Sequence, residues 1–120
     1  MHELAIADAI VTIAAEHAAG RRVTAVEVRI GRLRQVVPSS LDFSFELVAQ
    51  GTPVEGAELR IENVPARVAC RDCAAESRVE EFPLVCASCG SLTVDVVAGD
   101  ELLVDALELE DEPIAAMARR

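Results

Sequence analysis

Two short segments, Cys70-Arg71-Asp72-Cys73 and Cys86-Ala87-Ser88-Cys89, hold the only four cysteines of the chain. Together they form the pattern C-x2-C-x12-C-x2-C. Two residues between cysteines allow a tight turn that aims both sulfurs at one point, so two such pairs can supply four thiolates to a tetrahedral zinc ion. We therefore predict that Cys70, Cys73, Cys86 and Cys89 hold zinc.

The residue after the second pair supports this prediction. Gly90 stands where the chain has to turn back with a positive φ, which glycine adopts at low cost. The alternatives are two disulfides or four unlinked core thiols, and nothing in the sequence indicates an oxidising compartment. Four cysteine ligands leave no open coordination position, which favours structural zinc over zinc that activates water.

Composition excludes several classes of function. The 120 residues have the size of one ordinary domain, and 52% of them are hydrophobic, which is enough to build a core. The formal net charge is −10, and with three Phe, no Trp and no Tyr the chain has few aromatic rings on which bases could stack. Both features argue against binding nucleic acid. With two His and no nucleophile and base at a recognisable spacing, we expect no enzyme activity.

All eleven basic residues are Arg, and five of them fall within a fourteen-residue stretch. These five are Arg21, Arg22, Arg29, Arg32 and Arg34. One interpretation is a solvated face that meets acidic neighbours such as Glu58, Glu62 or the C-terminal acids; the other is a docking face for an acidic partner protein.

Hydrophobic periodicity predicts an α+β fold of two helices on a small three-stranded sheet, with an inserted zinc-ribbon module. The helices are expected at 3–19 and 40–50, the second with a capping box of Ser39 and Asp42, and the strands at 23–30, 57–64 and 102–109. We predict a main domain formed by 1–65 plus 99–110, a zinc-binding module at 66–98 with short strands at 77–81 and 92–97, and a flexible tail at 111–120. A segment as short as the module usually needs a metal or disulfides to fold.

The start of the chain is not typical of a secretory or membrane protein. The apolar run from Leu4 to Ala15 has no basic residue before it and contains Asp8, so it matches neither a signal peptide nor a bilayer span. We expect a cytoplasmic protein that does not bind membranes.

The first three residues, Met1-His2-Glu3, form a candidate nickel site. The α-amine of Met1, the amide nitrogen of His2 and its imidazole can close adjacent chelate rings of five and six atoms, and Glu3 can add its amide nitrogen or a carboxylate oxygen. Such a nitrogen-rich set suits Ni(II) or Cu(II). The alternative is that Glu3 only favours the dipole of the first helix.

Four motifs follow one another along the chain: Met1-His2-Glu3 before a helix, the strand end Ile30-Gly31, the helix start Ser39-Ser40-Leu41 and the paired C-x2-C motifs. In this order they resemble the HypA/HybF family of hydrogenase maturation nickel chaperones. The resemblance spans residues 1 to about 110.

By this resemblance His2 is the principal nickel ligand, the Met1 amine and Glu3 assist, and the four cysteines hold structural zinc. It implies a nickel metallochaperone that works with a nickel-handling GTPase and serves the large subunit of [NiFe]-hydrogenase, and in some organisms urease maturation. The alternative is an acidic zinc-ribbon adaptor in nucleic-acid or transcription machinery, which the net charge and the lack of Lys disfavour.

Overall fold

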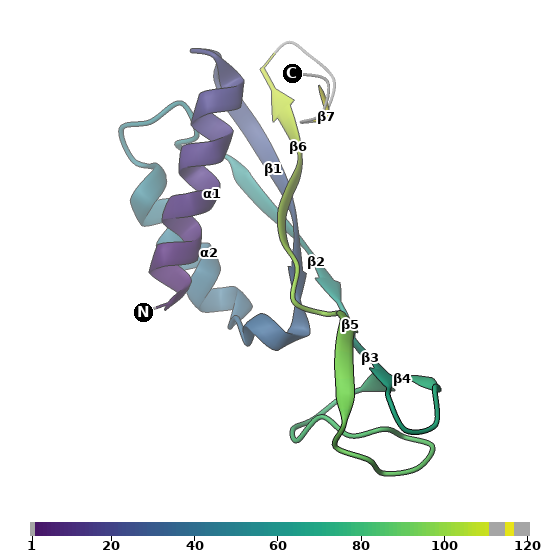
Figure 1. The fold of residues 1–120 in the computed structure, drawn as a ribbon. Coiled ribbons are helices and arrows are strands. Elements are labelled where there is room, and N and C mark those ends of the chain that lie inside the picture. The colour runs from purple at the N-terminus through teal and green to yellow at the C-terminus, as the bar shows by residue number, and fades with distance from the viewer. Residues whose placement is uncertain (1, 111–114, 117–120) are drawn as a thin grey trace. The chain divides into compact units, whose positions relative to one another are not determined.

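The structure is a computed structural model that describes residues 2–110 and the backbone of Ala115–Ala116 (Figure 1). In chain order its elements are α1 (His2–Ala18), β1 (Val23–Gly31), the 3-10 helix η1 (Arg32–Arg34), α2 (Pro38–Ala49), β2 (Glu58–Val64), β3 (Ala66–Cys70), β4 (Glu76–Val79), β5 (Val94–Ala98), β6 (Leu102–Leu109) and β7 (Ala115–Ala116). Two helices and two small sheets confirm the predicted α+β class.

The two helices pack against each other, and each buries one stripe of apolar side chains. The fully buried positions of α1 recur at helical spacing and comprise Ala7, Ile10, Val11, Ala14 and Ala18. In α2, Leu41, Phe45 and Ala49 are buried at steps of four. These stripes are visible in the sequence as helical periodicity. The predicted ranges of both helices are therefore close to the observed ones.

The start of α2 differs from the expected capping box. Its N-cap is Val37, which makes no side-chain cap hydrogen bond, and Pro38 occupies the first helical position. Ser39 therefore lies inside the helix and does not cap it. Proline favours the first helical position because its fixed φ suits the helix and because an N–H at that position would have no acceptor within the helix. This preference overrides the local capping signal of the serine.

The main sheet has the strand order β2-β1-β6-β7, with α1 and α2 on one face of β1, β2 and β6 (Figure 1). It contains a fourth strand where three were predicted, because β7 pairs antiparallel with β6 through Ala106–Ala116 and Leu107–Ala115. This short strand falls within 111–120, where a flexible tail was expected. The rest of that tail lies outside the described residues.

The second sheet has the order β4-β3-β5, and its central strand was not predicted. Both neighbours pair antiparallel with β3. This sheet carries a small core of its own, formed by Ala66, Val68 and Val79 with the partly buried Leu33, Leu84 and Val94 packed against it. So few apolar side chains bury too little surface to hold a segment folded without further support.

By its internal contacts the chain forms two compact units. The first comprises Met1–Arg29, Val36–Glu62 and Leu103–Arg120, and the second comprises Ile30–Gln35 and Asn63–Leu102. Residues 30–35 belong to the second unit because the amides of Gly31 and Leu33 donate to the carbonyls of Glu101 and Gly99, at 2.8 and 2.7 Å. The predicted domain division concerns independent folding and stays a prediction.

Most of the clustered arginines are engaged within the fold. Arg29 pairs with Asp105 at 3.0 Å, as expected for a face that meets acidic neighbours. The side chains of Arg22 and Arg34 donate to the main-chain carbonyls of Glu55 and Asp100, at 2.9 and 2.8 Å. Docking of an acidic partner here stays a prediction.

Within the described residues, neither helix is long and apolar enough to cross a membrane.

Two glycines allow a close backbone crossing in the second unit. A Cβ on Gly31 would lie 2.0 Å from the carbonyl oxygen of Gly99, and a Cβ on Gly99 would lie 2.5 Å from the Cα of Ala66. The φ of Gly31 is −76°, which any residue adopts, so the requirement for glycine at this position is one of space alone.

We predict that Gly31→Ala lowers the free energy of unfolding by about 2 kcal/mol or more, because backbone atoms would have to separate to admit the methyl group. Chemical denaturation of the metal-loaded protein measures this. Gly51→Ala is the control, since its surroundings are open within 4 Å and only its φ of +77° opposes the change, at about 1 kcal/mol. Equal losses in the two variants would contradict the steric explanation.

Candidate metal centres

The four cysteine sulfurs meet at one point of the second unit. Cys70 ends β3, and Cys73 follows in the turn toward β4, while Cys86 and Cys89 lie in the segment between β4 and β5. All four sulfurs lie within 4.8 Å of one another. This is the only such group of three or more His, Cys, Asp or Glu side chains in the described part of the chain.

The sulfur spacing fits a tetrahedral metal ion. The Cys70 and Cys89 sulfurs are 3.7 Å apart, and those of Cys73 and Cys86 are 3.5 Å apart. A Zn–S bond of about 2.3 Å in a tetrahedron implies sulfurs about 3.8 Å apart, whereas a disulfide requires about 2.05 Å. All four are free thiols, so the geometry favours a metal over the disulfide alternative.

The two cysteine pairs form matching turns. In the first, the amides of Asp72 and Cys73 donate to the sulfur of Cys70 at 3.3 and 3.4 Å, and in the second the amide of Ser88 donates to the sulfur of Cys86 at 3.4 Å. Such donors stabilise sulfur as a thiolate, which is the form that binds metals.

Each turn closes with a residue at positive φ. Gly90 has a φ of 76°, as the sequence predicted, and its amide donates to the carbonyl of Cys86 at 2.8 Å. Ala74 takes the equivalent place in the first turn with a φ of 63°, and its amide donates to the carbonyl of Cys70 at 3.1 Å. Nothing in the residue pattern indicated this strain, because alanine is uncommon in that conformation.

The thiols influence one another's protonation. The amides of Cys89 and Ser88 lower the pKa of Cys86 to about 7. The amide of Ser91 lowers the pKa of Cys89, but burial and the surrounding thiols, Cys70 foremost, outweigh it and raise that pKa to about 12. Without a metal the four groups are therefore not all ionised at neutral pH. A bound divalent cation would supply the positive charge that keeps four thiolates together.

Side chains outside the site link its two halves. Asp72 in the first turn accepts a hydrogen bond from the hydroxyl of Ser91, which follows the second turn. Arg71 forms a two-pronged ion pair with Asp95 on β5, at 2.7 Å from Nη2 to Oδ1 and 3.0 Å from Nε to Oδ2. These links orient the turns that carry the sulfurs.

The candidate nickel residues lie at the start of α1 in the first unit. The side chain of His2 is 53% exposed, whereas that of Glu3 is only 15% exposed, and their Nε2 and Oε2 atoms are 3.7 Å apart. The predicted α-amine ligand belongs to Met1, which lies outside the described residues. The other histidine, His17, is separate from these residues in the last turn of α1, where its Nδ1 lies 3.0 Å from the carbonyl oxygen of Ile13.

Glu3 also contacts α2, which the sequence did not predict. Its Oε2 accepts a hydrogen bond from the amide of Val37 at 3.1 Å, and this bond is the main reason that the pKa of Glu3 is lowered. Only a backbone atom of Val37 takes part, so no residue type could have signalled the contact.

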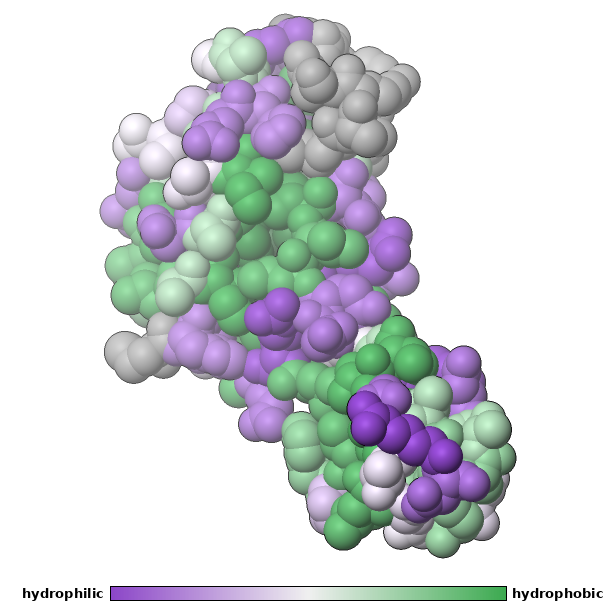
Figure 2. All heavy atoms as spheres, viewed as in Figure 1, coloured by the Kyte–Doolittle hydropathy of each residue, from purple (hydrophilic) through white to green (hydrophobic). Residues whose placement is uncertain are grey.

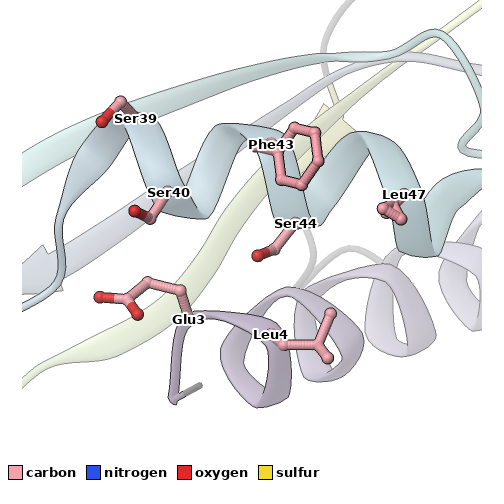
Figure 3. Close-up of a pocket in the computed structure, with 7 residues that line it drawn as sticks. All are labelled: Glu3, Leu4, Ser39, Ser40, Phe43, Ser44 and Leu47. Carbon is pink, nitrogen blue, oxygen red and sulfur yellow. The ribbon is translucent and has the colours of Figure 1, made fainter.

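Beside Glu3 a pocket of about 510 Å³ opens between α1 and α2 (Figure 3). Leu4, Phe43 and Leu47 supply its apolar lining, and three serines of α2 also line it. Hydrophobic surface gathers over the first unit in Figure 2, and the exposed apolar side chains of this unit's helices include Leu4, Ile13, Phe43 and Leu47.

We predict that Ala74→Gly raises the free energy of unfolding of the zinc-loaded protein by about 1 kcal/mol, because glycine relieves the positive φ. Denaturant titration provides the measurement. Gly90→Ala, at the matching place in the second turn, is expected to lose about as much. A neutral or destabilising Ala74→Gly would mean that the first turn is not strained.

We predict that Cys73→Ser releases the metal and unfolds residues 66–98 while α1, α2 and the main sheet stay folded, because the small core of the second unit cannot hold without it. Metal content and amide NMR spectra report the two effects separately. Ser88→Ala is the control, since the backbone amide that donates to Cys86 is kept. Loss of all cooperative unfolding would contradict the independent folding of the main domain.

The chain is similar to known proteins over nearly its whole length. Residues 1–109 match the model of the HypA family, described as hydrogenase/urease nickel incorporation, metallochaperone. The hydrogenase maturation factor HypA of Geotalea uraniireducens is 46% identical over 110 residues, which covers 92% of this chain and 100% of the relative. That of a Nostoc species is 39% identical over 111 residues, covering 92% and 97%.

Solved structures share the fold. The solution structure of the Ni metallochaperone HypA from Helicobacter pylori superposes with a TM-score of 0.66 at 24% identity, covering 89% of this chain and 96% of that one. A second HypA solution structure gives 0.67 at 26% identity, covering 93% and 98%. The resemblance noted from the sequence motifs is confirmed, and the chain belongs to the HypA family of nickel metallochaperones for hydrogenase and urease.

Proposed function

We propose that this metallochaperone binds Ni(II) at its N-terminus, with His2 as principal ligand and the Met1 α-amine and Glu3 assisting. The exposed imidazole of His2 in the first turn of α1 is the observation that supports this most directly. A metal held there can be reached by a receiving protein, which transfer requires.

Helix geometry adds nitrogen ligands to the imidazole. The first amides of a helix have no carbonyl four residues before them, so the hydrogen-bond ladder of α1 does not use the amide of its first residue, His2. An amine, an amide and an imidazole from consecutive residues form the nitrogen-rich set that Ni(II) and Cu(II) prefer. Protonation of these groups at mildly acid pH would release the metal, which suits a carrier.

The cysteine cluster has a different role in this proposal. Cys70, Cys73, Cys86 and Cys89 would hold structural Zn2+, since four sulfurs complete a tetrahedral shell and leave no position for substrate or water. We therefore propose a protein that carries nickel without catalysing a reaction.

The partners follow from membership of a hydrogenase maturation family. We propose that nickel passes between this chain and a nickel-handling GTPase, and on to the large subunit of [NiFe]-hydrogenase, in the cytoplasm. Urease maturation proteins are a further proposed destination, in keeping with the hydrogenase/urease description of the family. A net charge of −10 opposes the alternative of a zinc-ribbon adaptor for nucleic acid.

We predict that untagged, zinc-loaded protein binds one Ni(II) near neutral pH. His2→Ala is expected to weaken this binding at least about 100-fold. Loss of a residue that only hydrogen-bonds to a metal ligand costs roughly 10- to 100-fold in affinity, and loss of the ligand itself should cost more. Calorimetric titration measures both. His17→Ala is the matched control, since it removes the other imidazole of the same helix and is expected to bind nickel like the parent.

The same titration tests the amine. A residue added before Met1 turns the α-amine into an amide, and weaker binding is expected. If extended and unextended proteins bind equally, the amine is not a ligand. If His2→Ala binds nickel like the parent, or the parent binds none, the N-terminal site is wrong.

A further inference from the structure

One hydrogen bond joins the candidate nickel terminus to the second helix. The Glu3 carboxylate leaves the first turn of α1 and reaches toward the start of α2, as Figure 3 shows, where its Oε2 accepts from the amide of Val37 at 3.1 Å. In a capping box, an acidic residue of the same helix accepts the amide of the N-cap residue. Here Glu3 takes that place from another helix, at an N-cap that has no side-chain cap of its own.

The same carboxylate oxygen faces His2, whose Nε2 lies 3.7 Å away. In the chelate proposed above, the six-membered ring that runs from the His2 amide through its side chain can close only at Nδ1. Nε2 would then carry a proton and face the carboxylate. Metal-bound imidazoles commonly donate their second nitrogen to a carboxylate, which fixes the orientation of the ring.

We propose that the Glu3 carboxylate is a positioning group that orients the His2 imidazole and ties the nickel-binding terminus to the start of α2, and that it does not itself bind nickel. Of the two Glu3 atoms considered as nickel ligands, the carboxylate oxygen is then excluded and only the amide nitrogen is left. The part of this inference that concerns nickel rests on the proposed function, whereas the contact with Val37 does not.

Burial and hydrogen bonding both oppose the carboxylate as a ligand. The Glu3 side chain is 15% exposed, while that of His2 is 53% exposed. Turning the carboxylate toward a metal beside the exposed imidazole would break its bond to Val37 and leave that amide without this acceptor. If the carboxylate keeps accepting from the Val37 amide, nickel can bind and leave without any rearrangement of this hydrogen bond.

The first test uses nickel-free protein and the amide of Val37. In Glu3→Ala we expect this amide to exchange its hydrogen at least about tenfold faster and its NMR resonance to move, because the acceptor is gone. Glu3→Gln keeps a carbonyl oxygen at the same place and is expected to retain protection. Val37→Ala keeps the amide and removes only an exposed side chain, so it is the matched control.

The second test measures nickel affinity by calorimetry. We expect Glu3→Ala to lose about tenfold or more, in the range for outer partners of metal ligands, and Glu3→Gln to restore affinity to within about threefold of the parent. Val37→Pro removes the amide donor at a φ of −88°, close to what proline adopts, and is expected to weaken binding as well. The double variant Glu3→Ala, Val37→Pro should lose no more than Glu3→Ala alone.

The outcomes separate the two proposals. Equal losses in Glu3→Gln and Glu3→Ala would identify the carboxylate as a ligand and overturn the positioning role. Unchanged exchange of the Val37 amide in Glu3→Ala would overturn it without any reference to nickel. A parent protein that binds no nickel would overturn the proposed function. If the Val37 amide were then protected in the parent and in Glu3→Gln but not in Glu3→Ala, only the contact between the helices would be supported.

Discussion

Convergence of four cysteine sulfurs is the constraint on which the second unit depends. Its apolar core consists of Ala66, Val68 and Val79 with a few partly buried neighbours, which is little surface to offset the entropy of ordering the chain. The turns around the sulfurs supply amide donors and hold one strained alanine, Ala74. Metal binding would offset that strain and the mutual repulsion of the thiolates, so we expect the folding of this unit to depend on its metal.

The proposed nickel site at the N-terminus differs from the cysteine cluster in both exposure and rigidity. Its proposed ligands lie on a helix end whose first amides have no helical partner, and its imidazole is largely exposed. A site of this kind exchanges metal readily because few groups have to move. In our proposal the hydrogen bond between Glu3 and Val37 orients this site, because it holds the side chain beside the imidazole while the imidazole itself stays exposed.

Much of this organisation was visible in the sequence because the interactions are local. Apolar positions at helical spacing located both helices, and the cysteine spacing with Gly90 indicated the candidate metal site and one of its two residues at positive φ. The central strand β3 was not predicted from the sequence, because Ala66–Cys70 is short and leads directly into the first cysteine turn. Ala74 escaped because its positive φ is imposed by the turn around it and not by its own preference.

The sequence by itself determined which residues can bind metals and which segments have an apolar face, since both depend on residue type and spacing. Only the tertiary structure decided which groups meet across long separations in the chain. It replaced the expected Ser39 cap with the Glu3 contact to Val37, added β7 to the main sheet, and required glycine at position 31 because the backbone of Gly99 crosses there. These contacts use backbone atoms and packing distances, which side-chain identity does not encode.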